Sequence, residues 1–477
     1  MKTTLGLIVL VLLACNSASR PSPAGNAAAG ITPYDDHYGI YLNSHKVGWM
    51  RTRLSVGTDV VLTTELRAKV GGLGQVADMQ LDEKRVYDVH SGGLKALSFR
   101  QAASTGAVEV QGQMHGDTLA LRVIAGREVT EQQVVVHETV RDVQASTELA
   151  RHGVVGQTTS ARHFDPSVLK NLEVEHRIAA VETRLLDGVS ARVVRIDSLY
   201  RELGISESSW VDAEGTILES HVGGFFVARL EPEEVAKELT YQQDILVSAV
   251  VRPPVPMTDA EARQTLVVTL RGFGDLVPPT SERQRVEVRG DATVLRLTRD
   301  PHPPALTLAE LRRTSGAATD EDLQATPFIQ AHAPAIVAAA QEAIGDATDV
   351  FAATTRLVHF VAHHVRDAYV PAYSNAIEAL ESARGDCTEH AVLFVALARA
   401  LGIPARVAVG IAYWADGNGF GWHAWSEVRI GGRWLTVDPT WDQPIADVTH
   451  LKLAEGDPAQ QARIVMLLGK LEIVALQ

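Results

Sequence analysis

The pattern of apolar and polar positions changes about two thirds of the way along the chain. From residue 34 to about residue 250, short stretches alternate apolar and polar side chains and are separated by turn residues, which predicts antiparallel strands. From about residue 335, apolar side chains recur at every third or fourth position, which predicts helices. We therefore expect an α+β protein with an N-terminal antiparallel β region and a helix-containing C-terminal domain.

The breaks in this pattern suggest domain boundaries. Residues 252–256 read Arg-Pro-Pro-Val-Pro, which interrupts the strand pattern. We predict an antiparallel β domain at 34–250, a β-rich intermediate segment at 251–325 and a helix-containing domain at 326–477. The expected strands of the first region are 38–42, 47–50, 60–69, 108–113, 119–124, 129–136, 191–196, 209–211 and 216–222. Further on we expect strands at 265–271, 285–297 and 473–476, and helices at 335–344, 350–365 and 375–382.

A single cysteine stands at the expected start of the most apolar helix. Asp386 is a good N-cap for this helix, and Glu389 can complete a capping box. The run from 392 to 401 is apolar on nearly every face, so the helix should be buried. A thiol at the positive end of the helix dipole should have a lowered pKa, which makes Cys387 a candidate nucleophile.

Two strands expected after this helix carry a histidine and an aspartate. His423 lies near the start of the first strand and Asp438 near the end of the second, with Gly431 and Gly432 as a two-residue hairpin turn between the strands. Such a hairpin can place His423 and Asp438 side by side. A thiol, an imidazole and a carboxylate are the groups needed for nucleophilic attack on a carbonyl with proton transfer.

The motifs GDCTEHA, LARALGIPARVAVG, HAWSEV and WLTVDPTWDQ, in this order, resemble the transglutaminase-like superfamily, a branch of the papain-like cysteine protease fold. The resemblance covers about the last third of the chain. It implies a helix carrying the cysteine packed on an antiparallel sheet. It also implies that Cys387, His423 and Asp438 form a catalytic triad.

The resemblance leaves the reaction open. It implies cysteine-dependent acyl transfer on protein or peptide amides through a thioester, with an amine as acceptor. A cysteine peptidase or amidase that hydrolyses envelope peptides is the first alternative. A catalytically silent binding or assembly module is the second, and loss of a triad member would favour it; here the triad residues are all present.

Four further residues are candidates for binding the substrate. Trp422 and Trp441 flank the motifs of the histidine and the aspartate, and an aromatic wall there would exclude water from the acyl group. Tyr373 and Asn375 lie in a loop upstream of the cysteine and are candidate donors to the oxyanion. His390 follows the cysteine by three positions, but on a helix its side chain is expected to pack or to bind backbone.

No cofactor or metal is expected. His359 and His363 have the spacing of zinc ligands on a helix, but no third ligand is evident from the sequence. No calcium-binding pattern is present either. The formal net charge of −14 and the absence of a long basic run exclude nucleic acid as an expected partner.

The first residues resemble a secretory signal. Lys2 precedes a short apolar run, and the sequence up to Cys15 resembles a bacterial lipoprotein cleavage site. We predict a signal peptide at 1–14, lipidation of Cys15, and a flexible tether at 15–33 that is rich in Ser, Pro, Ala and Gly. These features predict an exported, lipid-anchored protein of the bacterial cell envelope, with the outer membrane favoured, acting on a protein or peptide. The oligomeric state is not predicted.

Overall fold

The computed structural model describes residues 31–477 except 43–44, 73–74, 104–105, 127, 187–188, 224–225, 240–249, 258, 315–320 and 369–374. The predicted signal peptide, Cys15, nearly all of the tether and Tyr373 lie outside the described residues. The chain divides into two compact units: of the described residues, the N-terminal unit contains those up to 70 and those of 77–243, and the C-terminal unit contains those of 244–477 with the short stretch 71–76. The architecture is α+β, as the sequence predicted.

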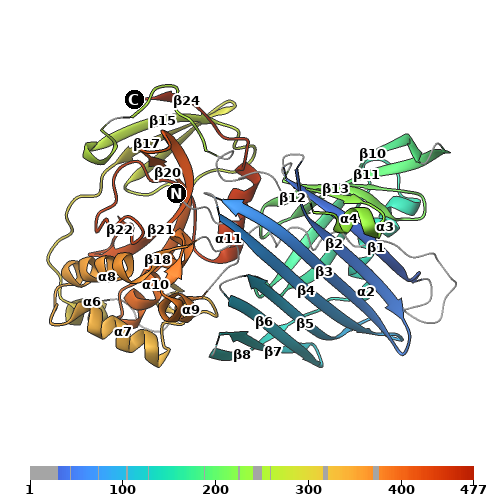
Figure 1. The fold of residues 1–477 in the computed structure, drawn as a ribbon, viewed down its shortest axis with the longest axis horizontal. Helices are drawn as coiled ribbons and strands as arrows, with labels where there is room; N and C mark the ends of the chain where they lie inside the picture. The colour runs from blue at the N-terminus through green and yellow to red at the C-terminus, as the bar shows by residue number, and fades with distance from the viewer. Residues whose placement is uncertain are drawn as a thin grey trace. The chain divides into compact units, whose positions relative to one another are not determined.

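The N-terminal unit is built on one antiparallel sheet of fourteen described strands (Figure 1). The strand order β8-β7-β6-β5-β4-β3-β2-β1-β14-β13-β12-β11-β10-β9 joins two meanders through the pair β1–β14. The first meander comprises β1 (Tyr34–Leu42), β2 (His45–Val56), β3 (Asp59–Gly72), β4 (Gln75–Asp88), β5 (Leu94–Ala103), β6 (Gly106–His115), β7 (Thr118–Ala125) and β8 (Glu128–Val135). The second comprises β9 (Thr158–Asp165), β10 (Lys170–Leu186), β11 (Val189–Tyr200), β12 (Ile205–Val211), β13 (Ile217–Val222) and β14 (Phe226–Leu230).

The sheet curls, so that strands far apart in the strand order contact each other. Arg85 on β4 donates a hydrogen bond to the backbone oxygen of Phe164 on β9 at 2.8 Å. Asn171 on β10 donates to the backbone oxygen of Val135 on β8 at 2.9 Å. Strands alternate buried and exposed positions, as in β7, because one face lines the interior. Short helices α2 (Val140–Val143) and α3 (Ala145–His152) connect the two meanders, and α4 (Glu233–Lys237) follows β14.

The C-terminal unit contains a four-stranded antiparallel sheet of order β22-β21-β20-β23. Its strands are β20 (Ala405–Trp414), β21 (Gly419–Ile430), β22 (Arg433–Val437) and β23 (Leu451–Glu455). Helix α10 (Cys387–Ala400) packs on β21 and β20 and is surrounded by α7 (Pro334–Ile344), α8 (Val350–His364) and α9 (Ala376–Ser382). Residues 387–399 are all buried, so the prediction of a buried helix is confirmed.

A second sheet connects the start of this unit to the end of the chain. Its order is β16-β17-β15-β24, from β15 (Thr265–Arg271), β16 (Gln284–Arg289), β17 (Ala292–Thr298) and β24 (Glu472–Leu476). The pairing of β15 with β24 ties the segment after residue 251 to the C-terminal domain. The remaining elements are short: η2 (Ala260–Ala262), α6 (Leu308–Thr314), η3 (Glu321–Leu323), β18 (Arg366–Asp367), β19 (Arg384–Gly385), α11 (Pro458–Ala462) and η4 (Arg463–Leu467). Within the described residues, no helix is long and apolar enough to cross a membrane.

Candidate active site

Cys387 is the first residue of α10, and a capping box fixes its position. The carboxylate of Asp386 accepts the backbone N–H of Thr388 at 2.9 Å. In turn, the carboxylate of Glu389 accepts a hydrogen bond from the backbone N–H of Asp386 at 2.7 Å. The predicted capping box is therefore confirmed. Gly385 permits this arrangement, because a Cβ at that position would lie 2.3 Å from the Cβ of Glu389.

The prediction that the helix dipole lowers the pKa of Cys387 is wrong. The residue is 1% exposed, and burial raises the pKa of its thiol well above the ordinary value. The nearby carboxylates of Asp386, Glu389 and Asp438 raise it further. The backbone N–H of Ala424 contacts the sulfur and acts in the opposite direction, but its effect is smaller. At neutral pH the resting thiol is therefore protonated, and an attack on a carbonyl requires a base that removes the proton during the reaction.

His423 lies on β21, directly before the residue whose N–H contacts the thiol. It pairs with Gly410 on the central strand β20. Its Nε2 lies 2.8 Å from Oδ2 of Asp438, which identifies Nε2 as the protonated nitrogen in the neutral ring. Its Nδ1 is buried and has no hydrogen-bond partner within the described residues. Nδ1 is thus the nitrogen available to accept the proton of Cys387.

Asp438 follows β22 and is held as an anion from two sides. Its Oδ1 accepts the backbone N–H groups of Thr440 and Trp441 at 2.8 Å and 3.2 Å. Burial raises the pKa of its carboxyl, but the charges and hydrogen bonds of His423 and His450 prevail and hold that pKa far below the usual range. The hairpin that delivers Asp438 turns at Gly431 and Gly432 with φ of 60° and 81°, as the sequence predicted.

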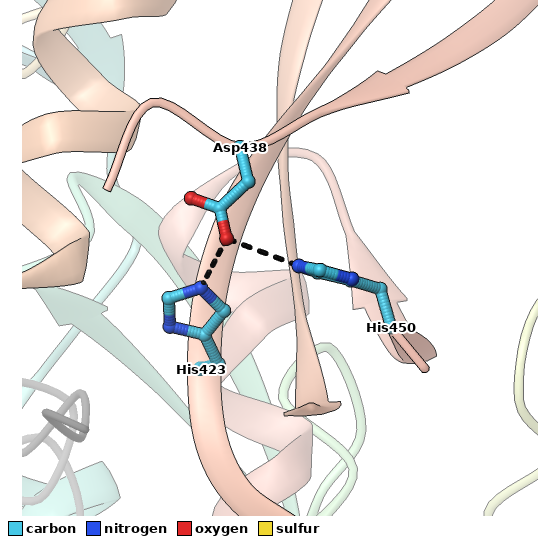
Figure 2. A group of neighbouring side chains, drawn as sticks. All are labelled: His423, Asp438 and His450. Atoms are coloured by element: carbon cyan, nitrogen blue, oxygen red, sulfur yellow. Dashed lines mark hydrogen bonds and ion pairs between the residues drawn. The ribbon is translucent and has the colours of Figure 1, made fainter. Parts of the chain in front are cut away.

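His450 is a member of this cluster that the sequence reasoning missed. Its Nε2 lies 3.0 Å from Oδ2 of Asp438, the oxygen that also contacts His423 (Figure 2). Burial lowers the pKa of His450, but the carboxylates of Asp447 and Asp438 raise it to about 9, so the ring is an imidazolium at neutral pH. Only the order of strands in the sheet could have revealed this residue. Strand β23 pairs with β20 on the side opposite β21, and His450 directly precedes β23.

The two predicted tryptophans have different surroundings. Trp441 stacks on His423, with ring centroids 4.4 Å apart and an interplanar angle of 14°. It therefore covers one face of the imidazole and is partly exposed. Trp422 is 2% exposed and belongs to the core of the sheet. The structure thus places Trp441 against the reacting groups and gives Trp422 no exposed face with which to bind a substrate.

Asn375 caps a helix. Its Oδ1 accepts the backbone N–H of Glu378 at 3.0 Å, and its Nδ2 lies 3.2 Å from Oε2 of the same residue. The side chain is fully buried at the start of α9. Its role as an oxyanion donor is therefore not supported by its contacts. Tyr373, the second candidate, lies outside the described residues.

Three other histidines of this domain have partners that account for them. His390 places Nδ1 2.6 Å from the backbone oxygen of Asp386 and Nε2 3.1 Å from that of Val365, so the prediction that it binds backbone is confirmed. On α8, His359 pairs with Asp442, and His363 contacts the backbone oxygen of His359.

Among the described residues, one set of side chains has the geometry of metal ligands. Atoms of His423, Asp438 and His450 all lie within 4.8 Å of one another. Hydrogen bonds from both imidazoles to Asp438 account for this convergence. A metal ion would have to displace the protons of both bonds, so the set fits a proton-transfer site better than a metal site.

Comparison with known proteins agrees with this geometry. Residues 337–439 match the family model described as the transglutaminase-like superfamily, so the C-terminal domain is transglutaminase-like. No curated protein matches the chain. Among solved structures, a candidate cysteine protease from Cytophaga hutchinsonii is similar at 17% identity, with 45% of this chain and 87% of that chain covered and a TM-score of 0.31.

Two further solved structures are similar. A β-barrel-like protein of a domain of unknown function from Brucella abortus has 9% identity, covers 42% of this chain and 95% of its own, and has a TM-score of 0.35. A candidate protease from Parabacteroides distasonis has 10% identity, covers 80% of this chain and 70% of its own, and has a TM-score of 0.20. Because these identities and scores are low, the assignment of the domain rests on the family match.

Proposed function

We propose that the C-terminal domain catalyses cysteine-dependent acyl transfer on protein or peptide amides. The observation that carries the proposal is the arrangement of His423. Its Nε2 is bound to Asp438, its Nδ1 is buried and unpaired, and the next residue of the strand contacts the sulfur of Cys387. This arrangement provides a nucleophile, a base and a group that orients the base.

In the proposed reaction, the sulfur of Cys387 attacks the amide carbonyl carbon while Nδ1 of His423 takes the thiol proton. The C–N bond then breaks, His423 returns the proton to the leaving nitrogen, and ammonia or an amine departs. The resulting thioester is attacked by an acceptor amine, whose proton passes to His423, and the thiol is regenerated. Asp438 stays ionised throughout and stabilises the imidazolium that forms.

The burial of the thiol affects which acceptor can attack the thioester. Because Cys387 and His423 are each 1% exposed, the site must open to admit a substrate and then excludes bulk water from the thioester. This favours an amine acceptor over water. Hydrolysis by the same steps would make the domain a peptidase or amidase.

The same burial supports a second candidate, a catalytically silent binding or assembly module. A thiol that is covered and has a raised pKa is unreactive unless the site opens. The two candidates differ in a measurable way, because only an enzyme forms a covalent acyl adduct on Cys387.

The test uses the full chain with Cys15 replaced by serine, so that Cys387 is the only thiol. It is incubated with a glutamine-containing peptide and a fluorescent primary amine. Acyl transfer predicts release of ammonia, incorporation of the amine and a peptide adduct on Cys387 detected by mass spectrometry. Cys387→Ala should abolish all three, and His423→Ala should reduce the rate by about 10²- to 10⁴-fold. His363→Ala, at an exposed position of α8, is the matched control and should leave the rate unchanged.

The outcomes distinguish the three candidate functions: acyl transferase, peptidase or amidase, and silent module. Cleavage of the peptide without incorporation of the amine would indicate a peptidase or amidase. Two results together would favour the silent module. The folded chain would form no adduct with any of a range of acyl donors, and the alkylation rate of Cys387 would be unaffected by His423→Ala.

We also propose that the protein is exported and anchored in the bacterial envelope through a lipid on Cys15. The support is the apolar run and the residues before this cysteine. Mass spectrometry of the N-terminal peptide from the membrane fraction should detect a lipid on Cys15. In the Cys15→Ser variant the chain should lose its membrane association; an unchanged distribution would contradict the anchor.

A further inference from the structure

The N-terminal unit contains a polar cavity of about 60 Å³. It lies between β3 and β4 on one side and β9, β10 and β11 on the other, where the curled sheet brings its distant strands together. Its polar lining includes Glu83, Arg85, Ser146, His163, Asp165 and His176. A polar cavity of this size has room for several water molecules or for one very small ligand.

The single arginine of the lining is not available to a ligand. Nε of Arg85 donates to Glu83 at 2.6 Å, and Nη1 lies 2.6 Å and 2.7 Å from the two carboxylate oxygens of Glu138. Nη2 donates to the backbone oxygen of Phe164 at 2.8 Å. All three nitrogens of the guanidinium are therefore engaged with the protein. Two carboxylates already compensate its charge, so the cavity holds no free cation that would attract an anion.

The atoms without partners are mostly acceptors. One carboxylate oxygen of Glu83 accepts a hydrogen bond from Arg85, and Oδ1 of Asp165 accepts hydrogen bonds from the backbone N–H and the hydroxyl of Ser167. Among the described residues, the second oxygen of each carboxyl group has no hydrogen-bond partner. His176 is 6% exposed and uses Nδ1 to contact Ser198 at 2.8 Å, which leaves its Nε2 without a partner in the described structure.

The charges of the lining also favour a cation. Burial raises the pKa of Glu83 and that of Asp165; the charge of Arg85 acts in the opposite direction on both, and the charge of Asp165 raises the pKa of Glu83 further. Burial lowers the pKa of His176 to about 3, and it also lowers the pKa of His163. The lining thus holds two buried carboxyl groups, and its one cation, Arg85, is shared with Glu138. A bound cation would favour the ionised forms of Glu83 and Asp165.

A bare metal ion does not fit this set. The converging group of histidine and carboxylate atoms found in the described residues lies in the C-terminal unit, not here. The acceptors of the cavity are instead spread around a space, so they suit a polyatomic cation whose N–H groups point in several directions.

We propose that this cavity binds a small protonated primary amine, with its ammonium group between Glu83 and Asp165 and within reach of His176. The ammonium supplies three donors for the unpaired acceptors and a positive charge for the two carboxylates. The amine is either a free small molecule or the end of a longer chain, such as a lipid headgroup. This proposal concerns the N-terminal unit and is independent of the reaction at Cys387.

The test is calorimetric titration of the full Cys15→Ser chain with ethylammonium chloride at constant ionic strength. We expect one site per chain and a Kd of about 1 mM, near the limit for so few ligand atoms. Ethanol and acetate, the neutral and anionic counterparts, should bind at least tenfold more weakly. Hexylammonium tests for the end of a longer chain: binding similar to that of ethylammonium indicates an open cavity, and loss of binding indicates a site for a free amine.

Isosteric variants test the assigned residues. Glu83→Gln combined with Asp165→Asn keeps the contacts to Arg85 and Ser167 but removes both charges, and it should weaken ethylammonium binding at least tenfold. Asp82→Asn is the matched control, because it removes a partly exposed carboxylate from the same strand β4 and should leave the Kd unchanged. His176→Phe, which removes the third proposed contact and keeps a ring in its place, is a second variant if the double variant does not fold, and it should weaken binding several-fold. The proposal would be overturned if ethylammonium did not bind at concentrations up to 50 mM, about fifty times the expected Kd. It would also be overturned if ethylammonium bound equally well to the double variant.

Discussion

His450 donates to the same carboxylate oxygen of Asp438 that His423 uses, at 3.0 Å, and it does so as a buried cation. The carboxylate therefore serves two imidazoles, of which one is charged in the resting state (Figure 2). The hydrogen bond and the charge of His450 stabilise the ionised form of Asp438, whose Oδ2 also contacts Nε2 of His423.

Replacement of His450 by glutamine should therefore change the pH dependence of the reaction at Cys387. His450 loses its charge as the pH rises through about 9, so the wild-type rate should change there, and this change should be absent from the variant. The rate at neutral pH should fall by about tenfold. The measurement is the pH profile of kcat/KM, or of Cys387 alkylation if no substrate is found. His364→Gln, on α8, is the control. An unchanged profile in the His450 variant would show that the residue only supports the fold.

The raised pKa of His450 also predicts how stability depends on pH. A group with a folded pKa of about 9 and an unfolded pKa of about 6.5 contributes its full stability below pH 6.5 and loses it as the pH rises through 9. The loss should amount to about 3 kcal/mol between pH 6.5 and 10. Urea unfolding across this range measures it, and the difference between the wild type and His450→Gln isolates the contribution of this residue. A constant difference across the range would contradict the assigned charge.

The elements around the site could be read from the sequence where local chemistry determines them. The capping residues Asp386 and Glu389 and the turn at Gly431 and Gly432 are short-range signals, and the structure confirms them. His450 could not be found in this way. It lies twelve residues after Asp438 and approaches it only because β23 returns beside β20. Sequence spacing does not show which strand neighbours which.

The electrostatics of the cysteine were mispredicted for a related reason. The position of Cys387 at a helix N-terminus is a local property and was read correctly. Burial of the thiol and the approach of Asp438 are long-range properties, and they reverse the direction of the pKa shift. The long strand β10 was also missed, because its sequence contains many charged residues, and the alternation of buried Val174, His176 and Ile178 becomes evident only in the structure.

The N-cap of α10 provides a prediction about both stability and reactivity. Asp386→Ala removes the acceptor for the Thr388 N–H in a buried position, so it should destabilise the protein by about 2 kcal/mol. Because the carboxylate of Asp386 raises the pKa of Cys387, its loss should increase the alkylation rate of the thiol at pH 8. Asp349→Ala, which removes the N-cap of α8, is the matched control. It should cost about 1 kcal/mol and leave the alkylation rate unchanged. Equal alkylation rates in both variants would contradict the assigned effect of Asp386.

The stacking of Trp441 on His423 provides the last prediction. The indole lies parallel to the imidazole at 4.4 Å and holds the ring in the orientation that keeps Nε2 on Asp438. Trp441→Leu should therefore lower kcat by about tenfold with little change in KM, because the base is less well placed in the transition state while substrate binding is retained. Trp434→Leu is the control: this partly exposed indole stacks on Arg406 at 4.0 Å, and its loss should leave kcat unchanged. An increase in KM alone would instead assign Trp441 to the binding of the substrate, and equal effects of the two variants would mean that the stacking on His423 does not matter for the reaction.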